Sequence, residues 1–217
     1  MYQNRAEPDL RLIVITDREL AAPRDLLHIV RLSLEAGAPA VQLREKDATA
    51  REIYELATRL RALTREYGAH FFVNDRLDIA LAVGADGVHI GPKDIPIEAA
   101  RAAAPKPFLI GISTDDPATA RRAEAAGADY IGCGAVFGTK TKKDAGDERI
   151  GPDGLKRVAS AVSIPVVGIG GIDTENISDL RGTGAAGVAV IGAVMKAQDP
   201  RAATSKLLEL HQIGAER

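Results

Sequence analysis

The chain has one cysteine, no tryptophan and few other aromatic residues, and each shortage removes a class of protein. A lone Cys133 cannot form an intramolecular disulfide, which excludes a disulfide-stapled scaffold and favours a reducing, cytoplasmic setting. With 28 basic side chains against 30 acidic ones, and 4% aromatic residues, no nucleic-acid surface is expected. No apolar run approaches the roughly 18 residues of a membrane span, and the polar first residues do not resemble a signal peptide.

What the sequence does have is a series of eight short apolar runs, seven of which end in charged, hydroxyl or glycine residues. The runs cover residues 10–16, 40–47, 71–76, 88–94, 108–114, 130–144, 166–171 and 188–193. Such runs are typical of parallel strands that are buried on both faces. We therefore expect one (β/α)₈ barrel over residues 1–217, with a short polar extension at 1–9 and the chemistry at the carboxyl ends of the strands.

Helical patterns separate these runs. We expect helices at 23–36, 49–67, 76–83, 96–104, 115–126, 153–162, 174–182 and 198–212. The clearest is 49–67, where Thr49 and Glu52 form a capping-box signature. Glycines at 37, 84, 127 and 184 suit the left-handed position that follows a helix. The long segment 134–151 has no clear pattern, and it is either a substrate-gripping loop or a solvated excursion.

Two glycine-rich strand ends are candidate phosphate sites. Gly168 to Gly171 follow the seventh run, and Ile191 to Ala193 follow the eighth. In many barrels these two loops bind a phosphate through backbone N–H groups. The bland alternative is that the glycines only allow tight turns between strand and helix.

Two carboxylates follow neighbouring strands. Asp75 and Asp94 end the third and fourth runs, and neighbouring strands lie about 5 Å apart, so both side chains can face one point. Such a pair suits a hard cation such as Mg²⁺, although each Asp is also a good cap for the following helix. His89 lies within the fourth run, pointing away from or below the rim, where we expect it to be packed and hydrogen-bonded.

Cationic and neutral donors complete the candidate site. Arg44, Lys46, Lys142, Asn74 and Ser113 lie at strand ends or on the long loop, and with Mg²⁺ they describe a site for a diphosphate. The sequence shows no evident nucleophile–base pair and no Schiff-base lysine. A reaction driven by departure of diphosphate fits a site that has many phosphate-binding groups and few proton-transfer groups.

Taken together, the segments ITDREL, QLREKD, FFVNDR, DGVHIG, GIST, GTKTKKD, VVGIGGI and GVAVI closely resemble the thiamine-phosphate synthase family over residues 11–212. The resemblance implies a (β/α)₈ barrel that uses Mg²⁺ to join a hydroxymethylpyrimidine diphosphate to a thiazole phosphate, or to its carboxylated form. It implies thiamine phosphate and diphosphate as products. It leaves open whether the chain forms a homo-oligomer.

The resemblance also assigns roles to individual positions. It places Gln42, Leu43, Arg44, Glu45, Lys46, Asn74, Ser113 and Lys142 at the pyrimidine diphosphate, with Arg44, Lys46, Ser113 and Lys142 as the catalytic residues. Asp75 and Asp94 would hold Mg²⁺. The thiazole phosphate would be held by Thr139, Lys140, Thr141, Gly171, Ile191 and Gly192. Gly192 departs from the family pattern, because serine is common there.

Two alternatives stay open at the level of sequence. One is a relative without synthase activity, either a thiazole tautomerase or a regulatory protein. Such relatives tend to lose the Arg-Glu-Lys, Asn-Asp and metal-binding Asp positions, and the tautomerases carry a histidine where this chain has Asp115. The other is a barrel enzyme for a sugar or indole phosphate, which needs a general acid and base; Glu45 is the free candidate on the second strand.

Overall fold

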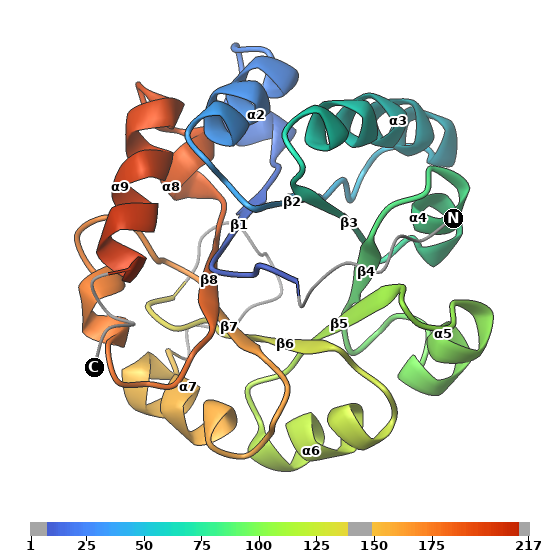
Figure 1. The fold of residues 1–217 in the computed structure, drawn as a ribbon, viewed down its shortest axis with the longest axis vertical. Helices are drawn as coiled ribbons and strands as arrows, with labels where there is room; N and C mark the ends of the chain where they lie inside the picture. The colour runs from blue at the N-terminus through green and yellow to red at the C-terminus, as the bar shows by residue number, and fades with distance from the viewer. Residues whose placement is uncertain (1–7, 139–148, 213–217) are drawn as a thin grey trace.

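The computed structural model of the chain describes residues 8–138 and 149–212, and these residues form a closed barrel of eight parallel strands (Figure 1). The strands are β1 (Leu12–Ile15), β2 (Ala40–Leu43), β3 (His70–Asn74), β4 (Gly87–Ile90), β5 (Leu109–Ser113), β6 (Tyr130–Cys133), β7 (Val166–Ile169) and β8 (Gly187–Val190). Each pairs with the next along the chain, and β8 closes the barrel on β1 with Val188 opposite Leu12. The expected (β/α)₈ fold is therefore confirmed.

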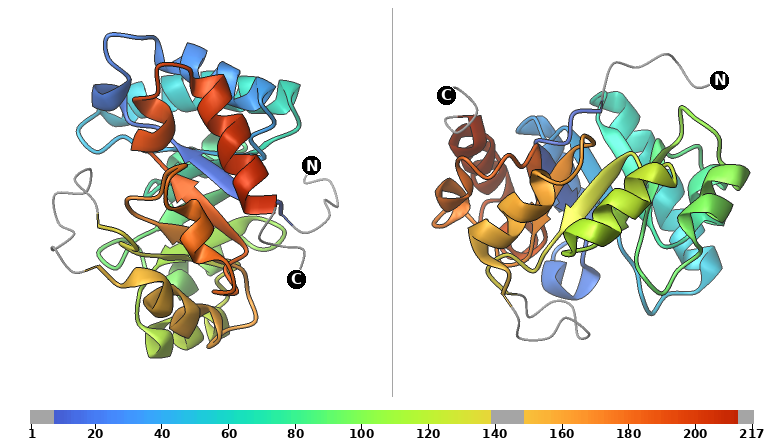
Figure 2. Two further views of the ribbon diagram at one scale, coloured as in Figure 1. Left: turned by 90° about the vertical axis from the view of Figure 1, so that its left-hand side faces the viewer. Right: turned by 90° about the horizontal axis from the view of Figure 1, so that it is seen from below.

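Helices surround the strands, as the side views also show (Figure 2). They are α1 (Arg18–Ala21), α2 (Leu26–Glu35), α3 (Ala50–Glu66), α4 (Leu77–Ala82), α5 (Ile97–Ala103), α6 (Pro117–Ala125), α7 (Gly151–Ala159), the 3₁₀ helix η1 (Ile177–Leu180), α8 (Gly192–Met195) and α9 (Pro200–Gln212). Among the described residues, no helix combines the length and the apolar character needed to cross a bilayer.

Local capping explains where several helices begin. The Thr49–Glu52 capping box is present at the start of α3, as expected. The predicted start of α2 at Pro23 is wrong, because Asp25 caps that helix through the Leu27 N–H at 3.3 Å. Asp17 caps a short helix, α1, that was not expected. Each correction follows from an Asp side chain that accepts from the first turn of a helix.

The end of α2 shows how helices return to strands. Gly37 has a φ of 94°, and the next N–H, from Ala38, donates to the Ser33 carbonyl at 3.0 Å. This pattern needs a left-handed residue, which glycine adopts without strain. The glycines at 84 and 127 follow the C-caps of α4 and α6 with positive φ, so the expected role is confirmed for Gly37, Gly84 and Gly127. Gly184 also has positive φ, but it lies four residues beyond η1 rather than directly after a helix.

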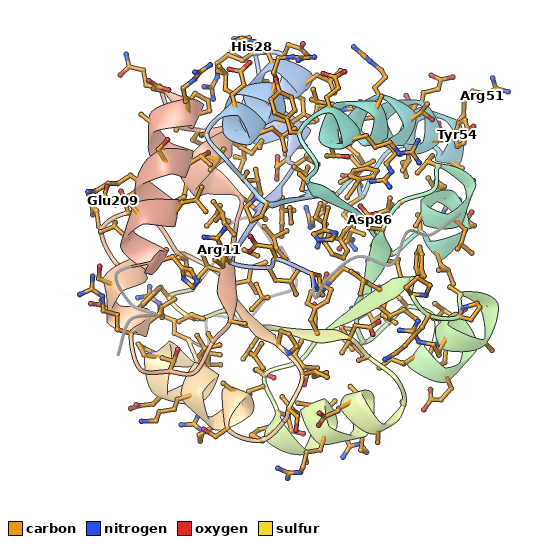
Figure 3. All side chains as sticks on the ribbon, viewed as in Figure 1. Arg11, His28, Arg51, Tyr54, Asp86 and Glu209 are labelled. Carbon is orange, nitrogen blue, oxygen red and sulfur yellow. The ribbon has the colours of Figure 1, made fainter. Side chains whose placement is uncertain are left out.

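Side chains fill the inside of the strand ring, whereas the labelled His28, Arg51 and Glu209 project outward from the helices (Figure 3). The interior cluster comprises Leu10, Ile13, Ile15, Ala40, Phe72, Tyr130, Val167 and Ala189. A larger apolar layer lies between the strands and the helices. Because side chains alternate along a strand, these interior residues also identify which later positions face the barrel axis.

Two buried ion pairs fasten helices to strand starts. Arg61 on α3 contacts both oxygens of Asp86, at 2.7 and 3.0 Å, and Asp86 also accepts from the Phe71 N–H. Arg101 on α5 contacts one oxygen of Asp129, just before β6, and that oxygen also accepts from the Ile110 N–H. Both pairs lie at the amino ends of strands, the end of such barrels that is associated with stability rather than with chemistry.

Candidate active site

Several predicted site residues share the inward face of their strands. Gln42 is two residues beyond the inward-facing Ala40 on β2, and Asn74 is two residues beyond Phe72 on β3. The same alternation brings Ser113, the last residue of β5, to the inward face. The carboxyl ends of three strands therefore deliver polar side chains to one end of the barrel, as the sequence predicts.

Lys46 and Asp75 meet at this end. The Lys46 ammonium forms an ion pair with Asp75 Oδ2, which joins the loops after β2 and β3. Asp75 is the one non-glycine residue with positive φ, at 63°, in the part of the chain that the structure describes. Its N–H donates to the His89 carbonyl at 2.8 Å. Strained backbone of this kind concentrates at functional sites, and Asp tolerates it better than most residues.

Asp94 lies beside Asp75. Its Oδ2 accepts from the Gly91 N–H at 2.6 Å, which folds the loop after β4 back on itself. Burial raises the pKa of Asp94, and the neighbouring Asp75 carboxylate adds to the rise. Two like charges held this close favour a cation between them.

Neither carboxylate serves as the helix cap that the sequence left open. The residue that precedes α4 is Arg76, and the residue that precedes α5 is Pro96; neither helix has a side-chain cap. The alternative role of both residues as helix caps is therefore wrong. Within the described residues no group of three or more His, Cys, Asp or Glu side chains gathers, so a cation here would take its remaining ligands from water or substrate.

Ser113 contacts a histidine, which the sequence pattern does not predict. Its Oγ lies 2.8 Å from His89 Nε2, and His89 Nδ1 lies 3.0 Å from the Tyr130 hydroxyl. The expectation that no serine–base pair exists is therefore wrong. The expectation of a packed, hydrogen-bonded His89 is confirmed, but its ring faces the candidate site rather than lying away from it.

The loop after β2 is held by its neighbours. The Arg44 N–H donates to Thr16 Oγ1 at 3.0 Å, and Glu45 forms an ion pair with Arg18 at 3.4 Å. The Glu45 side chain is 9% exposed, and burial raises its pKa. Leu43 packs outward in the layer under the helices, so any contact with a ligand would be through its backbone.

The two glycine loops differ in their surroundings. Gly170 and Gly171 have φ values of 101° and 68°, and a Cβ on Gly171 would lie 2.6 Å from the Gly138 carbonyl oxygen. Ile191 precedes α8, and Gly192 is its first residue, with at least 3.9 Å around a Cβ built there. The first N–H groups of a helix lack partners within it, so the loop after β8 can present N–H groups to an anion. The loop after β7 is followed by a helix only at Ile177, so its candidacy rests on its glycine backbone alone.

Four predicted residues, Thr139, Lys140, Thr141 and Lys142, lie outside the described residues, so their roles stay predictions. Two further residues, His89 and Tyr130, take part in the site although sequence reasoning assigned them none. Tyr130 faces Gly111 on the adjacent strand β5, and His89 faces Gly132 on β6, two strands away from β4. The glycines are visible in the sequence, but which ring each one faces is not. A Cβ on Gly111 would fall within the Tyr130 ring, and one on Gly132 would lie 2.8 Å from His89 Cε1.

Comparison with known proteins places this geometry in a family. Residues 12–194 match the family described as thiamine monophosphate synthase. A thiamine-phosphate synthase of Pyrococcus furiosus is 51% identical over 201 residues, covering 93% of this chain and 94% of that protein. The enzyme of the same name from Archaeoglobus fulgidus is 48% identical over 207 residues, covering 95% and 96%.

Solved structures agree with the sequence comparisons. A thiamine phosphate pyrophosphorylase from Pyrococcus furiosus superposes with a TM-score of 0.88 at 47% identity, covering 96% of this chain and 98% of that one. A 3-hexulose-6-phosphate synthase from Salmonella typhimurium reaches 0.70 at 19% identity, covering 94% and 99%. The second likeness, at so low an identity, shows the barrel fold alone.

Proposed function

Because this chain belongs to the thiamine-phosphate synthase family of transferases, we propose that it joins hydroxymethylpyrimidine diphosphate to thiazole phosphate. The bond between the pyrimidine methylene carbon and the diphosphate oxygen breaks, and its electron pair leaves with diphosphate. The thiazole nitrogen then donates its lone pair to the electron-poor methylene carbon. The products are thiamine phosphate and diphosphate. A carboxylated thiazole phosphate is the second candidate for the acceptor, and its carboxyl group would leave as CO₂.

The convergence of Lys46, Asp75 and Asp94, at the barrel end that also receives Ser113, is the observation that supports this proposal most strongly. A departing diphosphate gains negative charge, and fixed cations and donors at that place stabilise it more than they stabilise the bound substrate. Arg44, Lys46 and Lys142 would supply positive charge. Asn74 and Ser113 would supply neutral donors, and Gln42 would contact the pyrimidine.

The donor set of Asp75 and Asp94 fits Mg²⁺. Both ligands are carboxylate oxygens, and Mg²⁺ commonly takes one or two carboxylates while keeping waters and substrate phosphates as its other ligands. When bound, the ion would neutralise charge on the leaving diphosphate. Lys46 would balance the two carboxylates, because its ammonium pairs with Asp75.

The thiazole phosphate would bind at the opposite side of the mouth. Backbone N–H groups at Gly171, Ile191 and Gly192 suit a phosphate, as in many barrels with glycine loops after β7 and β8. Thr139, Lys140 and Thr141 would complete this end. We propose no nucleic-acid partner and a reducing, cytoplasmic setting, which the buried Cys133 thiol suits.

The direct test is to mix purified protein with both substrates and Mg²⁺ and to follow the products by mass spectrometry. We expect thiamine phosphate to form. A tautomerase would alter the thiazole phosphate without consuming the pyrimidine, and a regulatory relative would bind without turnover. Consumption of a sugar or indole phosphate, unaffected by chelators, would instead identify a different barrel enzyme.

A further inference from the structure

Three polar side chains form a line inside the barrel, from β6 through β4 to β5. The Tyr130 hydroxyl lies 3.0 Å from His89 Nδ1, and His89 Nε2 lies 2.8 Å from Ser113 Oγ. Gln42 on β2 interacts with the same Tyr130 hydroxyl. Ser113 is thus the outer end of a chain of hydrogen bonds that begins in the buried interior.

Glycines on β5 and β6 make room for this line. Gly111 leaves the volume that the Tyr130 ring occupies, and Gly132 leaves the space against His89 Cε1. Tyr130 is 1% exposed, and its ring meets Phe72 edge to face with centroids 5.5 Å apart. Neither ring can turn freely in such a site, so the order of the contacts is set by packing.

Either of two proton arrangements satisfies these distances. If Tyr130 donates to Nδ1, then Nε2 carries the proton and donates to Ser113, whose own O–H is left to donate elsewhere. In the reverse arrangement, Ser113 donates to Nε2 and becomes an activated nucleophile. The Tyr130 hydroxyl has two neighbours, His89 Nδ1 at 3.0 Å and the Gln42 side chain. Where Gln42 donates its amide N–H to the Tyr130 oxygen, the phenol's own proton points to Nδ1, which gives the first arrangement.

We propose that Tyr130 and His89 are positioning residues that hold the Ser113 hydroxyl as a hydrogen-bond donor to the departing diphosphate. This inference rests on the proposed function. It adds the direction of the hydrogen bonds at Ser113, which the function alone does not specify. A donor strengthens its contact as the phosphate oxygen gains charge, whereas an activated nucleophile has no bond to form in that reaction. In this proposal the Ser113–His89 pair provides a hydrogen-bond donor and not a nucleophile with its base.

A double-mutant cycle tests the coupling. Tyr130→Phe keeps the ring and removes only the hydroxyl, and we expect it to lower kcat about tenfold, because one charge-assisted hydrogen bond is weakened. KM for the thiazole phosphate should stay unchanged, since that phosphate binds elsewhere. In a Ser113→Ala background, Tyr130→Phe should cause no further loss. An equal loss in both backgrounds would mean a packing role and would overturn the proposal.

Two comparisons make the cycle specific. His89→Gln, which keeps an amide N–H that can donate to Ser113, should retain several-fold more activity than His89→Leu. Equal activities would contradict the positioning role of His89. Tyr67→Phe is a matched control, because its hydroxyl bonds to Arg31 and Glu35 on the outer surface and its removal should not alter kcat.

Nitrogen NMR of histidine-labelled wild-type protein reads the proton positions directly, with the His89 signal assigned by its absence in His89→Gln. We expect a protonated Nε2; an unprotonated Nε2 would overturn the proposal even if a variant fails to fold. If the wild type makes no thiamine phosphate but Nε2 is protonated, then the proposed function fails, while the Tyr130–His89–Ser113 hydrogen-bond order stands. If the wild type makes thiamine phosphate but Nε2 is unprotonated, then the proposed function stands and the donor role of Ser113 fails.

Discussion

The Lys46 ammonium pairs with the Asp75 carboxylate across the ends of β2 and β3, although the two residues are far apart in the chain. Asp94, from the next loop, adjoins the same carboxylate. A cation and two candidate metal ligands therefore form one charged cluster at the barrel mouth. Removing one charge from this cluster should disturb the others more than the loss of an exposed ion pair would.

Asp75→Asn removes the charge but keeps the shape. Asparagine tolerates the left-handed backbone that Asp75 adopts, so the fold should survive. We expect kcat/KM to fall by a factor of about a hundred or more, with a higher Mg²⁺ concentration needed for half-maximal rate. Steady-state kinetics over a Mg²⁺ series measure both.

Asp78→Asn is the matched control for that variant. Asp78 is exposed, lies three residues after Asp75, and pairs with Arg76 two residues before it. Its removal should leave kcat/KM and the Mg²⁺ requirement unchanged. Equal behaviour of the Asp75 and Asp78 variants would show that Asp75 has no special role.

Gly192→Ser should be tolerated, in contrast to Gly171→Ala. The nearest atoms to a Cβ at 192 are 3.9 Å away, whereas at 171 a Cβ meets the Gly138 carbonyl oxygen and the φ is positive. We expect KM for the thiazole phosphate to change less than about threefold in the first variant and to rise at least tenfold in the second. A large rise for Gly192→Ser would show that the phosphate site needs the glycine.

Arg61→Met should destabilise the barrel without altering the chemistry. It leaves the Asp86 carboxylate buried without its guanidinium partner, and the loss should be about 3 kcal/mol. Urea unfolding measures this loss. Arg51→Met, exposed on the same helix (Figure 3), should stay within about 0.5 kcal/mol of wild type. Similar losses in the two variants would argue against a structural role for the Arg61–Asp86 pair.

Glu45→Gln should change how stability depends on pH. Because burial raises the pKa of Glu45 in the folded chain, the folded state holds its proton more tightly than the unfolded state does. Below the unfolded value both states are protonated and nothing is lost; as the pH rises from there through the folded pKa, ionising Glu45 costs stability. The variant should therefore gain on wild type between low pH and neutrality. Unfolding curves for both proteins at several pH values test this, and a constant difference would contradict it.

The sequence predicts the barrel well because its strands are mostly apolar and α2, α4 and α6 each end just before a glycine. Eight runs and four glycines, Gly37 among them, are local signals that need no tertiary information. Helix starts such as Asp25 were missed because Pro23 offered a competing signal. The segment 174–182 was expected to be a helix, but only a 3₁₀ turn forms there, at Ile177–Leu180.

The site was less predictable than the fold. Strand alternation brings Gln42, Asn74 and Ser113 to one end, so their convergence follows from the pattern. The His89–Ser113 contact does not, because it depends on which glycine lies opposite which ring across the barrel. Such cross-strand register is set by the closed sheet, and the sequence alone does not display it.

Parallel measurement of thiamine phosphate and diphosphate, during one reaction with both substrates, tests the central claim most directly. If charge stabilisation at the Lys46–Asp75–Asp94 cluster drives departure of diphosphate, the two products should appear at equal rates and both should stop when Mg²⁺ is chelated. Formation of thiamine phosphate at an undiminished rate with the metal removed would contradict the account.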